Sequence, residues 1–404
     1  MLVKEKEQKK DQQRNFDTVW HELETRHAWI IKEELYNNPR PAMSKLAFNW
    51  LDYDNRYAVA FREDNHLEEV IENTKDDWDA ILHLRHWVFN NMINGTNASV
   101  GSLDPLALLG AARAGGSSFC THFATVFVAA ATSLGFVARK LGIDREHTEN
   151  ESSNMHGVVD IWVDSLRKWV SLDPNYDHHY ELDGIPLNTE EIGKQWQKNK
   201  GKDIKVFMGP LKREVDRARG GGAGAAAGAG EACLHFWHHI ETNNNMFRRD
   251  GHGNREPTIL LVDEARKKQQ WYQGRPPNTF LHSRYTKGTF LITEDPDDAY
   301  PDLNSAYFEM LPPHKMPYYC RVQFYTPCSP NFSHYEVSVD GVSPVRIDGG
   351  EYPWRLHPGK CSFKVNSVSL AGHKGPLYEM SLNITEDSNK TGTWPGQFPR
   401  GHKY

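Results

Sequence analysis

Apolar residues recur at spacings of three and four in the middle of the chain, and this period predicts a buried helix. A Gly-Gly pair at 115–116 breaks the chain before it, Ser117 or Ser118 is expected to cap it, and Gly135 ends it. Cys120 then falls in the first helical turn. The repeating positions are Phe123, Ala124, Phe127, Val128, Ala131 and Leu134.

A second pattern is strict alternation, which predicts a β-hairpin over residues 156–172. Asp164 and Ser165 offer the turn between its two strands. If the turn is centred between them, antiparallel pairing sets His156 opposite Asp173 on the same face. A longer turn would slip the pairing by one or two residues and would still leave the carboxylate near the imidazole.

These two elements bring together the residue types that thiol acyl transfer requires. At a helix N-terminus, unpaired backbone N–H groups and the helix dipole favour a thiolate at Cys120 and can also hold an oxyanion. A histidine oriented by a carboxylate supplies the base. A lone cysteine is more often a small core residue, and a lone histidine is more often a satisfied polar group. The order Cys120, His156, Asp173 in these settings favours a catalytic triad.

The segments GGSSFCTHFA, LGFVARK, HGVVDIWV and KWVSLDP resemble the transglutaminase-like superfamily, over about residues 67–192. The resemblance implies a papain-like core, in which a cysteine helix packs on an antiparallel sheet that carries histidine and aspartate. It makes Cys120 the nucleophile, His156 the base and Asp173 the orienting residue, and it implies no cofactor. One position departs from the family, because Gly157 stands where many members have an aromatic residue or alanine.

Further helices are expected before the cysteine helix. The pattern from Phe16 to Tyr36 is helical, Thr74 with Asp77 reads as a capping box, and Asp104 with Pro105 opens a short helix. In the family such helices cover the catalytic helix. The expected fold class is therefore α+β: a transglutaminase-like (papain-like) catalytic core with N-terminal helices, followed by a C-terminal β-sandwich.

Residues that follow the predicted active-site strand are candidates for substrate contact. Asp177, His178 and Tyr180 leave the strand directly, Trp162 lies on its partner strand, and a helix capped by Thr189 follows. A metal site at Asp177–Tyr180 is the alternative, although the adjacent histidines would point in opposite directions on an extended chain.

A second group of histidines lies near residue 238. At helical spacing His235 and His239 share a face, as two zinc ligands would, but no third ligand follows at motif spacing. Aromatic packing or substrate contact is favoured there. Trp237, Phe236, Trp271 and Tyr272 read as core aromatics, with a stacking surface as the alternative.

The predicted organisation has five parts. Short alternating runs from residue 315 read as a β-sandwich, and two of its stretches resemble the fibronectin-like modules of some transglutaminase-like proteins. A Gly/Ala run at 220–230 reads as a flexible link. The parts are a disordered tail (1–15), helices with the catalytic core (16–215), a linker and connecting region (216–314), the sandwich (315–386) and a second tail (387–404).

Composition limits the classes of binding partner and the cellular compartment that we expect. The 47 Lys and Arg against 53 Asp and Glu give a net charge of −6, which argues against nucleic acid or an anionic membrane as main partner. Five cysteines without a CxxC pair form no disulfide framework or zinc ribbon, unlike the peptide N-glycanases of the same superfamily. The charged first 15 residues do not resemble a signal peptide, so a cytoplasmic location is the default unless a leader was removed.

The function expected from these observations is thiol-dependent hydrolysis or acyl transfer at an amide-type bond in a peptide, protein or glycoconjugate. Hydrolysis is favoured over cross-linking, since nothing resembles the calcium sites or β-barrels of animal cross-linking enzymes. The alternatives are a catalytically inactive binding protein of the same fold and a related cysteine enzyme that acts on a glycan. A metal-dependent hydrolase built on the histidines is a distant third.

Overall fold

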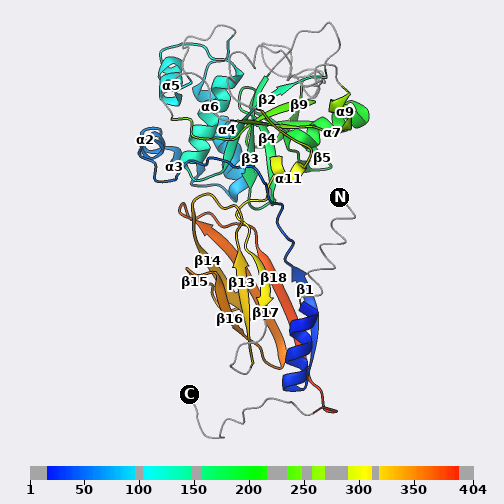
Figure 1. Ribbon diagram of the computed structural model, residues 1–404. Helices are drawn as coiled ribbons and strands as arrows, with labels where there is room; N and C mark the ends of the chain where they lie inside the picture. The colour runs from blue at the N-terminus through cyan, green and yellow to red at the C-terminus, as the bar shows by residue number, and fades with distance from the viewer. Residues whose placement is uncertain are drawn as a thin grey trace. The chain divides into compact units, whose positions relative to one another are not determined.

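The structure, a computed structural model, describes residues 16–95, 103–146, 156–215, 234–247, 257–268, 290–311 and 318–390. The chain divides into two compact units (Figure 1). One comprises residues 42–302, and the other joins the residues up to 41 with those from 303 onward. No helix within the described ranges has both the length and the apolar character needed to cross a membrane.

The unit of residues 42–302 is built on one large sheet flanked by helices. The strand order is β11-β10-β9-β2-β3-β4-β5-β7-β8, with β6 paired to β5, and all these pairs are antiparallel except β10 with β11. The strands are β2 (Ala138–Asp144), β3 (His156–Val163), β4 (Lys168–Asp173), β5 (His178–Leu182), β6 (Ile185–Pro186), β7 (Lys205–Met208), β8 (Arg213–Val215), β9 (Trp237–Glu241), β10 (Thr258–Leu261) and β11 (Phe290–Thr293). The helices are α2 (Arg56–Asp64), α3 (Leu67–Ile71), α4 (Asp77–Asn91), α5 (Pro105–Arg113), α6 (Cys120–Ser133), α7 (Thr189–Asn199), α9 (Glu264–Lys267) and α11 (Pro296–Ala299).

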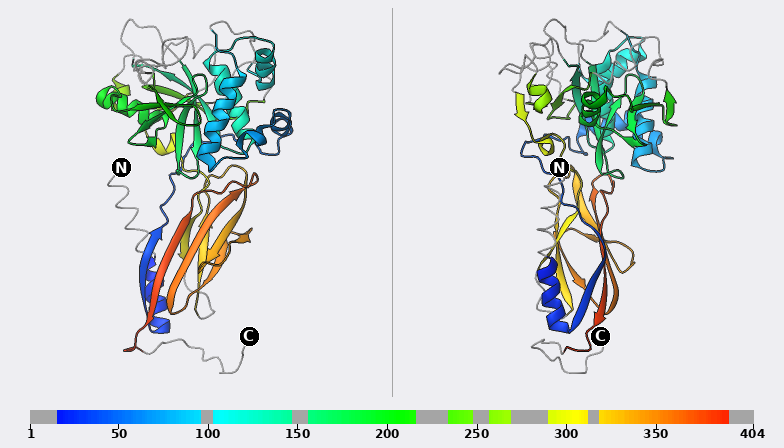
Figure 2. Two further views of the ribbon diagram at one scale, coloured as in Figure 1. Left: turned by 180° about the vertical axis from the view of Figure 1, so that it is seen from behind. Right: turned by 90° about the vertical axis from the view of Figure 1, so that its right-hand side faces the viewer.

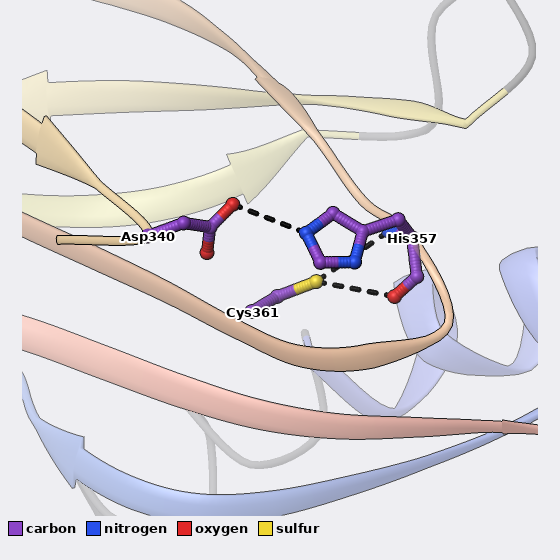
Figure 3. Close-up of side chains that lie close together, drawn as sticks. All are labelled: Asp340, His357 and Cys361. Atoms are coloured by element: carbon purple, nitrogen blue, oxygen red, sulfur yellow. Dashed lines mark hydrogen bonds and ion pairs between the residues drawn. The ribbon is translucent and has the colours of Figure 1, made fainter. Parts of the chain in front are cut away.

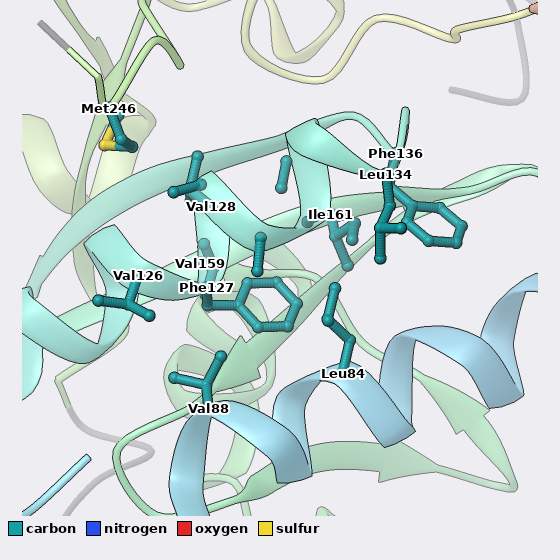
Figure 4. Packing of buried hydrophobic residues seen from close by; sticks show 14 of the residues in the cluster. Leu84, Val88, Val126, Phe127, Val128, Leu134, Phe136, Val159, Ile161 and Met246 are labelled. Carbon is teal, nitrogen blue, oxygen red and sulfur yellow. The ribbon is translucent and has the colours of Figure 1, made fainter. Parts of the chain in front are cut away.

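Helix α6 is the centre of this unit and is buried on nearly all sides. One side packs on the apolar residues of β3, and another packs on α4 (Figure 4). The side chains that meet there include Leu84 and Val88 of α4, Val126, Phe127 and Val128 of α6, and Val159 and Ile161 of β3. Burial of this apolar surface holds the first residue of α6 in a fixed place against the sheet.

Helix caps in the structure differ from the predicted ones by one or two residues. Helix α4 is capped by Asp76, whose side chain accepts from the Asp79 amide, and not by Thr74 paired with Asp77. Helix α7 is capped by Asn188, which forms a capping box, and not by Thr189. The prediction of Asp104 as the cap of α5 is confirmed. Several polar residues adjoin each helix start, so the sequence alone does not decide which of them adopts the extended cap conformation.

The second unit is a β-sandwich (Figure 2). A five-stranded antiparallel sheet, β1-β18-β17-β14-β15, packs against the three-stranded sheet β12-β13-β16, and their inner faces share one apolar core. The strands are β1 (Trp29–Asn37), β12 (Tyr307–Leu311), β13 (Tyr319–Tyr325), β14 (Phe332–Val339), β15 (Val345–Ile347), β16 (Glu351–Arg355), β17 (Gly359–Ser369) and β18 (Tyr378–Glu386). The predicted α+β fold with a C-terminal β-sandwich is therefore confirmed.

The segment predicted as one helix from Phe16 to Tyr36 is a helix only over residues 16–27. Ala28 has a φ of 54°, which ends the helix, and β1 then pairs along the edge of the sandwich with β18. The apolar residues of the helix pack in the sandwich core. The helical period of the sequence was misleading because the edge of β18, more than 300 residues away, supplies hydrogen bonds that local sequence does not reveal.

Two predicted boundaries are corrected by this arrangement. Residues 16–37 belong to the sandwich unit, not to the catalytic core. The region 216–314 is not a linker throughout, because β9, β10 and β11 extend the main sheet and β12 belongs to the sandwich. The Gly/Ala run at 220–230, the tail predictions for residues 1–15 and 391–404, and Trp271 and Tyr272 lie outside the described residues.

Candidate active site

Cys120 is the first residue of α6, as the pattern predicts, but its cap is different. The cap residue is Phe119, which is extended and offers no side-chain hydrogen bond to the first turn. Ser117 and Ser118 are therefore not caps. The Phe119 carbonyl accepts from the His122 amide at 2.8 Å, so the Cys120 N–H at the start of the helix is left to stabilise negative charge on a bound oxygen.

His156 and Asp173 come together in a β-hairpin. Its strand pairing is shifted by two residues from the pairing expected for a turn centred between Asp164 and Ser165. Val159 pairs with Leu172 and Val163 with Lys168, so the turn contains the four residues 164–167. A shift of two residues keeps every side chain on its predicted face, because strand side chains alternate with period two. His156 thus lies diagonally across from Asp173, and its Nε2 is 2.5 Å from the Asp173 Oδ2.

The bond to Asp173 fixes which ring nitrogen serves the cysteine. When Nε2 donates its proton to the carboxylate, Nδ1 is the nitrogen that remains for the sulfur. A hydrogen bond links the His156 ring with the Cys120 thiol. Cys120, His156 and Asp173 therefore form a continuous hydrogen-bonded chain from the start of α6 through β3 to the end of β4.

Asp173 is itself held in place by the backbone that follows it. Its Oδ1 accepts from the amides of Asn175 at 2.9 Å and Tyr176 at 3.3 Å, which leaves Oδ2 for His156. The Nε2 of His178 lies 3.7 Å from the same Oδ2. Burial lowers the pKa of His178 to about 4, so at neutral pH this second ring is uncharged and leaves His156 as the cationic partner.

The three pKa shifts agree with a preformed ion pair. Burial raises the pKa of the Cys120 thiol, but attraction to His156 and hydrogen bonds from His156 and Gly157 outweigh it, so the pKa falls below its ordinary value. Burial lowers the pKa of His156, but Asp173 and the Cys120 sulfur raise it well above the ordinary value. Burial likewise raises the pKa of Asp173, and His156 outweighs it and lowers the pKa. All three shifts thus favour the charged forms, which are thiolate, imidazolium and carboxylate.

The structure gives a packing reason for Gly157, the position that departs from the family. A Cβ atom at this residue would lie 3.0 Å from the Thr121 Cα and 3.1 Å from the Thr121 backbone N. These are backbone atoms of the first turn of α6, so they cannot rotate away. Gly157 therefore lets β3 approach the helix closely enough for its own N–H to reach the Cys120 sulfur.

We expect Gly157→Ala to lower kcat/KM about tenfold, because the methyl group separates β3 from the first turn of α6 by a few tenths of an ångström. The free energy of unfolding should fall by about 1–3 kcal/mol, as for other over-packed sites. Gly110→Ala is the matched control, since a Cβ there meets nothing within 4 Å. Steady-state kinetics that put both variants at the wild-type rate would contradict this account of Gly157.

The four predicted substrate-contact residues are all buried, with exposed fractions of 2–4%. The Trp162 Nε1 donates to Asp164, and the His178 Nε2 lies 3.2 Å from the Tyr180 hydroxyl. Asp177 is bound by two side chains from α4. The prediction of substrate contact is therefore corrected for Trp162, Asp177, His178 and Tyr180, because each is enclosed by the protein.

The residue that sequence reasoning missed is Arg85 of α4. Its guanidinium is fully buried and donates to the Asp177 Oδ1 at 2.8 Å, and it also contacts the His179 Nδ1 and the Gly209 carbonyl. His86 contacts the other oxygen of Asp177 at 2.7 Å. The signal was present, because Arg85 lies four residues after Ile81 and three before Val88, on the apolar stripe of a helix.

Residues 237–241 form strand β9, so His235 and His239 do not share the helix face that the alternative of a zinc site requires. Their rings instead contact Tyr180 and Phe290, in keeping with the aromatic packing that the sequence favoured. His238 faces away from both neighbours in the strand, and its Nε2 lies 3.4 Å from Glu190, which also binds Arg266. Burial, followed by repulsion from Arg266, lowers the pKa of His238 well below its ordinary value.

Residues 65–174 match the family described as the transglutaminase-like superfamily. Among solved structures, the chain is similar to a putative protease from Parabacteroides distasonis ATCC 8503, at 10% identity and a TM-score of 0.22, over 89% of this chain and 62% of that chain. It is also similar to red sea bream transglutaminase, at 10% identity and a TM-score of 0.22, over 78% and 72% of the two chains. The chain thus spans less than two thirds of the length of the first of these. No curated protein matches the chain.

Proposed function

Because this chain carries a domain of the transglutaminase-like superfamily at residues 65–174, we propose that it is a thiol enzyme that hydrolyses or transfers an amide-type acyl group through Cys120, His156 and Asp173. The observation that carries this proposal is the 2.5 Å contact of His156 with Asp173 beside a cysteine at an uncapped helix start. A cysteine that only fills space in the core would need neither a paired histidine nor a position at a helix start.

The reaction follows from the roles that the geometry supports. The Cys120 sulfur, deprotonated by the Nδ1 of His156, attacks the acyl carbon, and negative charge develops on the carbonyl oxygen. The Cys120 backbone N–H at the start of α6 stabilises that oxygen. His156 then gives its proton to the leaving amine, and a thioester on Cys120 remains.

The second half of the reaction releases the acyl group. Water, or a second amine, attacks the thioester carbonyl while His156 removes its proton, and the Cys120 sulfur departs. Throughout, Asp173 holds the ring and stabilises its positive charge. We favour hydrolysis of a peptide, protein or glycoconjugate substrate, so that water is the acceptor.

Incubation of the protein with pooled peptides, glycopeptides and polysaccharides tests this function, with products read by mass spectrometry. We expect products with the wild type and none with Cys120→Ala. The matched control is Cys328→Ala, which removes a partly exposed thiol from the sandwich and should leave all products in place. A product that takes up one ¹⁸O from labelled water identifies hydrolysis. A product that contains a new amide and no ¹⁸O identifies transfer. Identical products from wild type and Cys120→Ala would contradict the proposal.

A further inference from the structure

A second cluster of potential ligand groups lies in the sandwich unit, remote in sequence from the triad. Asp340 follows β14, His357 follows β16, and Cys361 lies near the start of β17 (Figure 3). One ligand atom of each residue lies within 4.8 Å of the other two. Within the described part of the chain, no other three such groups come together in this way. We propose that Asp340, His357 and Cys361 bind a zinc ion.

The orientation of the His357 ring supports a cation between it and Asp340. Its Nδ1 lies 2.9 Å from the Pro358 carbonyl oxygen, an acceptor, so Nδ1 carries a proton. Its Nε2 lies 3.2 Å from the Asp340 Oδ2. The Asp340 oxygen can only accept, so the contact is attractive when a cation, either a proton on Nε2 or a bound metal ion, lies between the two atoms. A backbone carbonyl that fixes the distal nitrogen is the usual support for a metal-binding histidine.

Asp340 is positioned by the strand that carries the cysteine. Its Oδ1 accepts from the Ser362 amide at 2.6 Å, and its own amide donates to the Ser362 carbonyl at 3.0 Å. These two bonds fix the carboxylate, and Oδ2 is left to face His357. The carboxylate thus has a supporting contact on one oxygen and a ligand position on the other, as metal-bound carboxylates do.

Cys361 completes the site from its buried side. The His357 amide lies 3.4 Å from the Cys361 sulfur as a donor, and the thiol donates to the His357 carbonyl at 3.3 Å. When zinc binds, the thiol proton leaves to solvent, a Zn–S bond forms, and the His357 N–H continues to stabilise the sulfur. The HPGKC turn therefore supplies two ligands from the same short loop.

The ligand set favours zinc over harder cations. One thiolate, one imidazole and one carboxylate suit a tetrahedral borderline metal, whereas magnesium and calcium prefer oxygen alone. Zinc bond lengths of about 2.0–2.3 Å place neighbouring ligand atoms about 3.5 Å apart, so the three ligand atoms have to move about 1 Å closer together when zinc binds. The His357 and Asp340 side chains are 46% and 29% exposed, which gives the ion access and leaves water as the fourth ligand. Bound zinc would tie the turn after β14 to the turn after β16.

Calorimetric titration of Zn²⁺ into the chelator-treated full chain tests the proposal. Cys120→Ala is used as the parent, so that the triad thiol does not contribute. We expect one Zn²⁺ per chain, a higher Tm with zinc, and a thiolate charge-transfer band when Co²⁺ replaces it. His357→Gln and Asp340→Asn should each weaken binding by at least about tenfold, and Cys361→Ser should abolish the Co²⁺ band.

Matched controls lie in the same sandwich. His334→Gln removes a half-buried histidine, and Cys320→Ser removes a buried thiol. Both should bind zinc like the parent. Because His357 and Asp340 are partly exposed, their variants should fold, and circular dichroism checks this. Absence of zinc binding by the parent would show that only a proton joins His357 to Asp340 and would overturn the proposal. Unchanged binding in all three ligand variants would overturn it equally.

Discussion

Replacement of Asp173 by asparagine is expected to reduce turnover by about four orders of magnitude. In serine proteases the corresponding substitution costs about 10⁴-fold in kcat, because the amide presents a donor to the histidine and stabilises the wrong tautomer. The same chemistry applies to the 2.5 Å contact of Asp173 with the His156 Nε2. The expected loss corresponds to about 5 kcal/mol of activation free energy.

Protein stability should change much less than activity. The Oδ1 of an asparagine at position 173 can still accept from the Asn175 and Tyr176 amides. We therefore expect the free energy of unfolding to fall by less than about 2 kcal/mol. Asp164→Asn is the matched control, because Asp164 lies in the turn of the same hairpin and its Oδ1 accepts from the Trp162 indole rather than from the His156 ring. Near-wild-type turnover by Asp173→Asn would show that Asp173 is structural and that the triad assignment is wrong.

Arg85→Met should lower the free energy of unfolding by about 3–5 kcal/mol. The substitution removes the buried guanidinium from the buried Asp177 carboxylate and leaves only the partly exposed His86 ring at its other oxygen, and loss of one partner of a buried ion pair has a cost of that size. Asp177 also has a φ of 53°, so the turn that leads from Asp173 to β5 depends on the contacts of its side chain. Activity should fall as well, because this turn supplies the amides that hold Asp173.

Chemical denaturation of Arg85→Met beside Lys205→Met measures the difference between a buried and an exposed ion pair. Lys205 pairs with Glu214 at the surface, where both side chains are more than half exposed, and its loss should cost less than about 1 kcal/mol. Equal destabilisation of the two variants would mean that the buried network around Asp177 is no more important than a surface contact.

The site was predictable to the extent that local patterns determine it. The helical period placed Cys120 in the first turn of α6, and alternation placed His156 and Asp173 on the same face of a hairpin. The exact pairing was not predictable, because the four-residue turn at 164–167 could be distinguished from a two-residue turn only by its backbone conformation. The contact between His156 and Asp173 persisted because the shift was an even number of residues.

Features that depend on distant segments were not predictable in the same way. Strand β1 pairs with β18, and the segment 16–37 therefore belongs to a unit formed mainly by the other end of the chain. Strands β9 to β11 join the main sheet from a region read as a linker. The acid Asp177 looked like a substrate ligand because it lies four residues after Asp173, the proposed orienting residue, whereas its partner Arg85 lies 92 residues earlier.

The central claim is that Cys120 is a nucleophile activated by His156, and the pH dependence of alkylation tests it most directly. Iodoacetamide labelling followed by peptide mass spectrometry gives a rate for each thiol in the wild type and in His156→Ala. Since the Cys120 pKa is lowered and that of His156 is raised, the wild-type rate at Cys120 should reach half of its maximum below about pH 8.5, the ordinary thiol value.

Cys320 and Cys361, whose pKa values are raised by burial, should remain unlabelled near neutral pH. In His156→Ala the Cys120 curve should move to higher pH, because the attraction and the hydrogen bond from the ring are lost. A wild-type curve that rises only above about pH 8.5 and coincides with that of His156→Ala would contradict the account.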